Sequence, residues 1–148
     1  MSTLERAIGI AAKEHEGQFD KGGAPYILHP LHVMLNFSTN EERITAVLHD
    51  VVEDSRGRIT LENLRSEGFS ESIIEAIDAV TIRLGEAYES FVLRAASNPI
   101  GRKVKLADLQ HNCDLSRIPN PTASDYERSK KYSLAIETIL NIEDKTNI

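Results

Sequence analysis

The chain has 148 residues and a formal net charge of −6, with 41% hydrophobic and 27% charged residues. These values are typical of one globular domain with its own core, and they argue against a protein that coats nucleic acid. The single cysteine, Cys113, excludes an internal disulfide and a thiolate-rich zinc site. Because we find neither a signal peptide nor a bilayer-spanning run, we expect a cytoplasmic protein that binds neither nucleic acid nor a membrane.

Apolar residues recur at helical spacing along most of the chain, which predicts an all-α fold of about seven or eight helices. A capping box that starts at Ser2 predicts a first helix ending near Gly17. Residues 18–26 are rich in glycine and proline and predict a loop. The pair His29-Pro30 then opens a second helix, because proline is tolerated in a first helical turn.

The remaining helix starts are marked by capping residues and proline. Asn40 is expected to cap the helix that carries His49 and Asp50, and Ser70 to cap a later one. Further helices are predicted at residues 60–67, at 86–97, from Pro99 onward, and after Thr122. We expect the last residues, 142–148, to fray.

Four candidate metal ligands interrupt apolar stretches of these predicted helices: His29, His49, Asp50 and Asp108. Charged groups on a mostly buried helix are costly unless something binds them, and a divalent metal ion is the obvious candidate. Mixed imidazole and carboxylate ligands suit Mn, Fe, Zn or Ni better than Ca, and Mg is a further option. A lone histidine beside a proline is usually only a helix-start residue, so the prediction depends on the combination.

Two more carboxylates, Glu53 and Asp54, follow His49 and Asp50 by three or four residues, which is about one helical turn. A divalent ion lowers the pKa of a water molecule that it binds, and a nearby carboxylate can orient that water or take its proton. The alternative is that both acids only solvate a helix end. Acids at a helix C-terminus oppose the macrodipole, which makes this alternative less attractive.

Three motifs carry a resemblance to a known family. They are Gly-Ala-Pro-Tyr-Ile-Leu-His-Pro at 23–30, Leu-His-Asp-Val-Val-Glu-Asp at 48–54, and Lys-Val-Lys-Leu-Ala-Asp-Leu-Gln-His-Asn at 103–112. With them the chain resembles the HD-domain metal-dependent phosphohydrolases, in particular the hydrolase domain of the Rel/SpoT alarmone enzymes and their small stand-alone relatives. The resemblance implies one HD domain over residues 1–148. It also implies one divalent ion, commonly Mn²⁺, on His29, His49, Asp50 and Asp108.

The resemblance further implies an enzyme that removes pyrophosphate from the 3′ position of ppGpp, with Glu53 and Asp54 handling the water. By the same resemblance, Asn112 meets the sugar or phosphate region of the nucleotide and Lys21 lies near its base. Lys105 precedes Asp108 by three residues, so it either meets phosphate oxygens or simply faces outward. The expected partner is a nucleotide substrate, and the expected assembly is a monomer or homodimer.

Three residues depart from the alarmone-hydrolase pattern: Asp20, Leu109 and Asp114. Each replaces a basic residue in the region that meets a highly phosphorylated nucleotide. Two alternatives therefore stay open, namely an HD phosphohydrolase acting on another nucleotide or phosphorylated metabolite, and a regulatory HD domain that binds nucleotide without turnover. The retained Glu53 and Asp54 weigh against the regulatory domain, because binding alone needs no water-activating pair.

Overall fold

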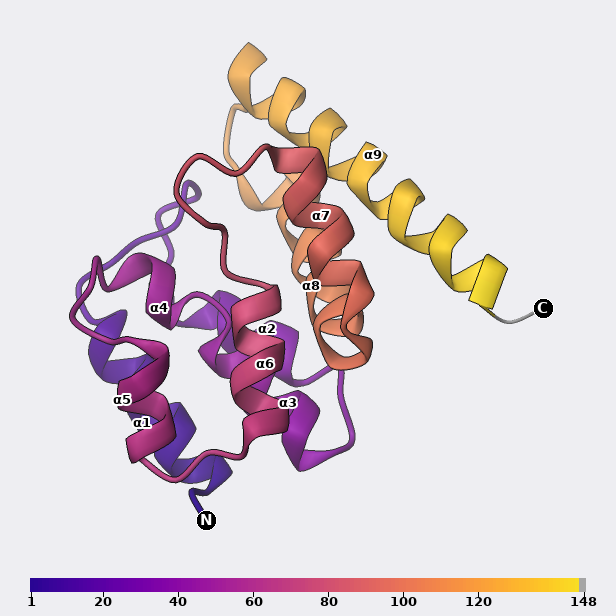
Figure 1. Cartoon of the computed structure of the whole chain (residues 1–148). Helices are drawn as coiled ribbons and strands as arrows, with labels where there is room; N and C mark the ends of the chain where they lie inside the picture. The colour runs from indigo at the N-terminus through magenta and orange to yellow at the C-terminus, as the bar shows by residue number, and fades with distance from the viewer. Residues whose placement is uncertain (147–148) are drawn as a thin grey trace.

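The computed structural model describes residues 1–146, which contain helices and no β-strand (Figure 1). The α-helices are α1 (Leu4–Glu14), α2 (Leu28–Met34), α3 (Asn40–Leu48), α4 (Val51–Asp54), α5 (Leu61–Ser66), α6 (Glu71–Ala79), α7 (Tyr88–Ser97), α8 (Pro99–Asn112) and α9 (Ala123–Thr146). A short 3₁₀ helix, η1, covers Leu115–Arg117. The predicted all-α class is confirmed.

The helix that was expected to carry His49 and Asp50 without interruption is broken at these two residues. Helix α3 ends at Leu48, and α4 begins at Val51. Asp50 has φ −106° and ψ −2°, and its carbonyl accepts a hydrogen bond from the Asp54 amide at 2.9 Å. The break divides one predicted helix into two, so the described residues hold nine α-helices rather than seven or eight.

Two of the four predicted capping residues are correct, and the other two are wrong by one position. Ser70 caps α6, and the Thr122 hydroxyl accepts from the Asp125 amide at the start of α9. At α1 the cap is Thr3 rather than Ser2, and at α3 it is Thr39 rather than Asn40. Thr39 has extended backbone angles and its side chain accepts from the Glu42 amide, whereas Asn40 is already helical.

Helix α3 lies at the centre of the larger core, in contact with α1, α2, α6 and α8 (Figure 1). Its Val47 and Leu48 are fully buried, which removes apolar surface from water on several sides of this short helix. His49 directly follows these residues, so the imidazole of His49 lies in the protein interior at the end of α3. Packing of α3 in the core therefore fixes the position of His49 and of Asp50 after it.

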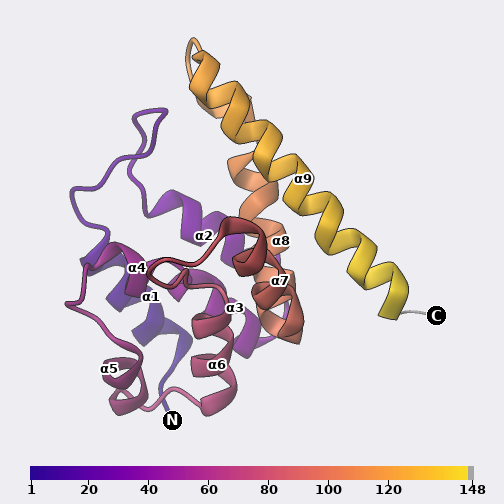
Figure 2. The same cartoon turned by 45° about the horizontal axis from the view of Figure 1, so that its top comes forward.

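A second, smaller core joins α7, α8 and α9, with Val92, Leu109 and Ile139 buried between them. Helix α9 runs along the outer side of α7 and α8 (Figure 2). Residues 142–148 were expected to fray; α9 is helical as far as Thr146, and residues 147–148 lie outside the described part. None of the helices in residues 1–146 has the length and apolar character needed to cross a membrane.

Candidate metal centre

The four predicted metal ligands meet in the interior of the chain, although they come from distant segments. His29 lies on α2, Asp108 on α8, and His49 and Asp50 in the break between α3 and α4. One ligand atom from each side chain lies within 4.8 Å of all the others. The two imidazoles and Asp108 are buried, and the Asp50 side chain is 18% exposed. This cluster can hold one divalent ion with an opening on the Asp50 side.

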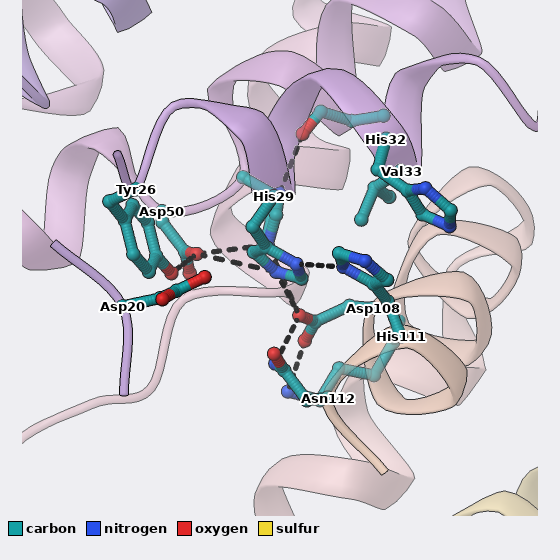
Figure 3. Close-up of polar contacts among 12 residues, drawn as sticks. Asp20, Tyr26, His29, His32, Val33, Asp50, Asp108, His111 and Asn112 are labelled. Atoms are coloured by element: carbon teal, nitrogen blue, oxygen red, sulfur yellow. Dashed lines mark hydrogen bonds and ion pairs between the residues drawn. The ribbon is translucent and has the colours of Figure 1, made fainter. Parts of the chain in front are cut away.

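Short distances connect the four side chains, as Figure 3 shows for His29, Asp50 and Asp108. His29 Nε2 lies 2.8 Å from Asp108 Oδ1 and 4.0 Å from Asp50 Oδ2. His49 Nε2 lies 3.0 Å from Asp50 Oδ2 and 3.3 Å from Asp108 Oδ1. The Nε2 atoms and carboxylate oxygens therefore converge on one small volume, as ligands of a shared ion must.

The hydrogen bonding of His49 fits a metal ligand. Its Nδ1 donates to the Ala46 carbonyl oxygen at 2.6 Å, which places the proton on Nδ1 and a lone pair on Nε2. Within the described residues, the buried Nε2 atom makes no hydrogen bond of good geometry, although it faces carboxylate oxygens of Asp50 and Asp108 at 3.0 and 3.3 Å. A metal-binding histidine is usually fixed in this way, with its other ring nitrogen bonded to a carbonyl. The donor set therefore fits a divalent cation.

Electrostatics in the cluster also favour a cation. Burial alone would raise the pKa of Asp108, but the Lys105 ammonium and the His49 imidazole hold it well below its usual range. Burial likewise opposes ionisation of Asp50, and attraction to His49 outweighs that effect and lowers its pKa. The pKa of His49 is raised by Asp50 and Asp108 despite its burial. Two charged carboxylates thus concentrate negative potential at the point where the four ligand atoms meet.

The carboxylate ligands are held by other side chains. Asp108 Oδ1 accepts from Asn112 Nδ2 at 2.9 Å (Figure 3). Asp108 Oδ2 accepts from Lys105 Nζ at 3.2 Å. The Tyr26 hydroxyl donates to Asp50 Oδ2. Lys105 is buried, so the structure places this predicted substrate-binding residue against Asp108. Tyr26 therefore bonds directly to a candidate ligand.

His111 contacts His29, although we did not select it from the sequence as a site residue. The Nδ1 atoms of the two rings lie 2.7 Å apart (Figure 3). Burial and the nearby Arg117 lower the pKa of His111 to about 4, so its ring is neutral. Its Nδ1 atom can therefore accept a hydrogen bond from the Nδ1–H group of His29. This leaves His29 Nε2 free to bind a metal. The sequence signal was present: His111 follows Asp108 by three residues on α8, one helical turn away.

Replacing His111 with leucine is expected to weaken Mn²⁺ binding about tenfold to a hundredfold, because His29 loses the acceptor that orients its ring. Isothermal titration of Mn²⁺ measures this change. His111→Asn is expected to recover part of the affinity, since its amide oxygen can accept from His29. Equal Mn²⁺ affinity in the wild type and His111→Leu would show that the contact has no orienting role.

Glu53 and Asp54 lie on α4, directly after the break that carries His49 and Asp50. Desolvation by the surrounding protein raises the pKa of Glu53, and the carboxylates of Asp50 and Asp54 raise it further. Desolvation and the charge of Asp50 also raise the pKa of Asp54. A carboxylate with a raised pKa is a better proton acceptor, which suits a group that takes a proton from water.

A cleft of about 440 Å³ lies next to the metal cluster. Tyr26 and Asn112 line it, and each also bonds to a candidate ligand, so the cleft and the cluster share a wall. The predicted nucleotide-binding residues Lys21 and Asn112 both line this cleft. Lys105 is not among the residues that line it.

The three departures from the family pattern have different structural roles. Asp20 Oδ1 accepts from the amides of Gly22 and Ala24, both at 2.9 Å, and Asp20 Oδ2 lies 3.3 Å from Arg117 Nη2. Asp114 caps η1 by accepting from the Ser116 amide. Leu109 is buried in the smaller core and does not reach the cleft. Of these three departures, Asp20 and Asp114 therefore add negative charge to the cleft wall, and Leu109 does not.

Replacing Asp20 with alanine is expected to lower the free energy of unfolding by about 1–3 kcal/mol, because two backbone amides lose their acceptor. Urea denaturation of both proteins measures the difference. The exposed Asp144→Asn on α9 is the matched control and should unfold like the wild type. Indistinguishable midpoints for Asp20→Ala and the wild type would contradict a structural role for these bonds.

Comparison with known proteins places the chain in a family. It is 33% identical to the GTP pyrophosphokinase of Streptomyces coelicolor over 92% of the chain, and 33% identical to the guanosine-3′,5′-bis(diphosphate) 3′-pyrophosphohydrolase of Aquifex aeolicus over 74%. The chain belongs to the Rel/SpoT-like hydrolase domains. This domain spans only 16% and 17% of those two relatives. No family model matches it.

A solved structure shares the fold of this Rel/SpoT-like domain. It is described as a metazoan ortholog of SpoT that hydrolyzes ppGpp, and it superposes with a TM-score of 0.76 at 21% identity. The match covers 95% of this chain and 85% of the other. The helical arrangement around α3 is therefore that of the SpoT ortholog.

Proposed function

We propose that this domain is a Mn²⁺-dependent hydrolase that removes pyrophosphate from the 3′ position of ppGpp. The observation that carries the proposal is the meeting of His29, His49, Asp50 and Asp108 within 4.8 Å, beside a cleft large enough for part of a nucleotide. The name of the Aquifex aeolicus relative supports the substrate. The retained carboxylates Glu53 and Asp54 support turnover over binding alone.

The reaction needs one water molecule for each ppGpp. A bond forms between the water oxygen and the phosphorus attached to the 3′ oxygen, the bond from that phosphorus to the 3′ oxygen breaks, and GDP and pyrophosphate leave. A divalent ion held by His29, His49, Asp50 and Asp108 would activate this water as a Lewis acid and neutralise phosphate charge. Glu53 or Asp54 accepts the proton of the water, and the 3′ oxygen gains a proton as it leaves.

Each remaining site residue has a defined part in this proposal. The two imidazoles and two carboxylates hold the ion, with His49 fixed through the Ala46 carbonyl. Lys105 and Asn112 keep the Asp108 carboxylate in place through their hydrogen bonds. Lys21 and Asn112 line the cleft and contact the nucleotide. The cytoplasmic location and the monomeric or homodimeric state stay predictions.

A second candidate is hydrolysis of a less highly charged nucleotide, and the charges of the cleft favour it. The acidic lining residues Asp20, Asp114 and Asp125 equal in number the basic residues Lys21, Arg117 and Arg128. Asp20 also pairs with Arg117, so this arginine is partly neutralised. A cleft with balanced charge attracts a polyphosphate less strongly than a basic one.

A substrate panel separates the two candidates. Purified protein with Mn²⁺ is offered ppGpp, the corresponding adenine compound, GTP and nucleoside monophosphates, and kcat/KM is measured for each. We expect the highest value for ppGpp, with pyrophosphate as a product. Phosphate release only from the other nucleotides would contradict the first candidate and support the second. Bound metal with no turnover of any compound would favour the regulatory domain.

A further inference from the structure

Gln18 lies between the two hollows on this side of the molecule. It lines the 440 Å³ cleft beside Tyr26, and it also lines a second hollow of about 480 Å³ that is shared with Glu53 and Asp54. It follows the end of α1, and its side chain is half-buried. Gln18 therefore links the nucleotide side of the site to the two carboxylates of α4.

The amide of Gln18 is bonded at both ends. Gln18 Nε2 donates to Asp54 Oδ2 at 3.1 Å, and Gln18 Oε1 lies 2.9 Å from His15 Nδ1. An ionised carboxylate can only accept hydrogen bonds, so the amide nitrogen must face Asp54 and the amide oxygen must face His15. His15 Nδ1 then carries a proton and donates it to this oxygen. The orientation of the Gln18 amide is fixed by its two partners.

His15 is held in a way that makes it a firm support. Only 2% of the residue is exposed, and its ring packs against Tyr26 with 5.0 Å between the ring centres. Among the residues that the structure describes, its Nε2 atom is buried without a hydrogen-bond partner. The hydrogen bond between His15 Nδ1 and the Gln18 amide oxygen is therefore the polar contact through which this buried ring is held.

The same loop also supports a metal ligand. The Tyr26 amide donates to the Gln18 carbonyl oxygen at 2.8 Å, while the Tyr26 hydroxyl donates to Asp50. The residues that contact Asp50 and Asp54 are thus joined through one backbone hydrogen bond. A shift of the Gln18 side chain would therefore change the orientation of the Asp54 carboxylate without removing any candidate metal ligand.

We propose that His15 and Gln18 are positioning residues that fix the rotation of the Asp54 carboxylate. Gln18 donates to Asp54 Oδ2, and His15 holds the Gln18 amide in the orientation that this bond needs. The proposal deepens the proposed hydrolytic function and rests on it for the role of Asp54. Gln18 itself takes no proton and binds no ion; it acts through Asp54.

Two substitutions of Gln18 separate positioning from simple packing. Gln18→Glu keeps an oxygen for His15 but loses the N–H that Asp54 accepts, whereas Gln18→Met loses both bonds at similar volume. We expect kcat for ppGpp to fall about tenfold to a hundredfold in both, because small misplacements of a reacting group have effects of this size. KM and Mn²⁺ affinity should stay close to wild type. Gln110→Glu, exposed on α8, is the matched control.

The kinetics of these variants can contradict the positioning role in two ways. Wild-type kcat in Gln18→Glu would overturn the proposal, because its intact acceptor for His15 would then be sufficient. If positioning acts through Asp54, adding Gln18→Met to Asp54→Asn should lower kcat no further than Asp54→Asn alone. A full additional loss in the double variant would also overturn it.

A spectroscopic measurement distinguishes failure of this proposal from failure of the proposed function. The carboxyl carbon signal of Asp54, followed by NMR in labelled protein, should change in Gln18→Met and stay unchanged in Gln110→Glu. An inactive wild type would contradict the hydrolase function, while this signal would still report whether Gln18 holds Asp54. An unchanged Asp54 signal in Gln18→Met would contradict the positioning proposal alone.

Discussion

Replacing Asp108 with asparagine is expected to weaken Mn²⁺ binding more than about a hundredfold and to abolish turnover of ppGpp. Loss of a direct ligand should exceed the tenfold to hundredfold effect that is common for residues supporting a ligand. Asp108 also lies close to both imidazoles, with its Oδ1 atom 2.8 Å from His29 Nε2 and 3.3 Å from His49 Nε2. Removal of its charge therefore affects every other member of the cluster.

Asparagine is preferred to alanine at this position because Lys105 is buried against the Asp108 carboxylate. Asparagine keeps an acceptor for the Lys105 ammonium, whereas alanine leaves that charge buried and unpaired. Mn²⁺ titration by electron paramagnetic resonance measures the affinity, and circular dichroism verifies the fold. Asp144→Asn, an exposed change of the same kind, should bind Mn²⁺ normally. Unchanged affinity in a folded Asp108→Asn protein would refute the assigned ligand set.

Replacing Glu53 with glutamine is expected to lower kcat by about 10²- to 10⁴-fold while Mn²⁺ affinity stays near that of the wild type. Glutamine has the shape of glutamate but cannot take a proton from water. Glu53 lies three residues beyond Asp50, and burial together with the charges of Asp50 and Asp54 raises its pKa. Its place one helical turn beyond the ligand Asp50 is why we expect it to act on the attacking water.

The test of Glu53 combines steady-state kinetics with metal titration. A fall in kcat with normal Mn²⁺ binding identifies a role in chemistry, whereas parallel loss of both would indicate a metal ligand. Glu75→Gln on the exposed side of α6 is the matched control. Wild-type kcat in Glu53→Gln would mean that Asp54 alone handles the water, or that neither carboxylate does.

His49, Asp50 and Asp108 could be selected from the sequence because each interrupts an apolar helix, whereas His29 stands at a helix start and was selected only in combination with them. His49 follows the buried pair Val47 and Leu48, and a charged group in such a setting needs a binding partner. The structure brings these side chains together with His29 and Asp108. Helical spacing alone placed His49 and Asp50 about 100° apart, and only the break in the helix shows how both reach one point.

The supporting contacts were beyond the reach of periodicity and local motifs. His111 bonds to His29, and Gln18 bonds to Asp54, across 82 and 36 residues of chain. Lys105 was left between a phosphate contact and an outward position, and the structure places it on Asp108 instead. Contacts of this kind depend on how helices pack. A residue pattern read along one helix cannot specify them.

The all-α class followed from the spacing of apolar residues, because most helices bury one face against α3 or α9. Helix ends were predicted less accurately. Thr39 and Asn40 both have side chains that can cap a helix, and the choice depends on backbone angles that are set by the preceding turn. The four-residue helix α4 is too short to show a period of its own.

The central claim is that this domain cleaves the 3′-pyrophosphate of ppGpp with a divalent ion on the four-residue cluster. The most direct measurement quantifies GDP and pyrophosphate after incubation of metal-free protein with ppGpp, with and without added Mn²⁺. We predict equal amounts of the two products with Mn²⁺, and neither without it or in Asp108→Asn. Absence of pyrophosphate with Mn²⁺ bound, or the same yield from Asp108→Asn as from the wild type, would contradict the account.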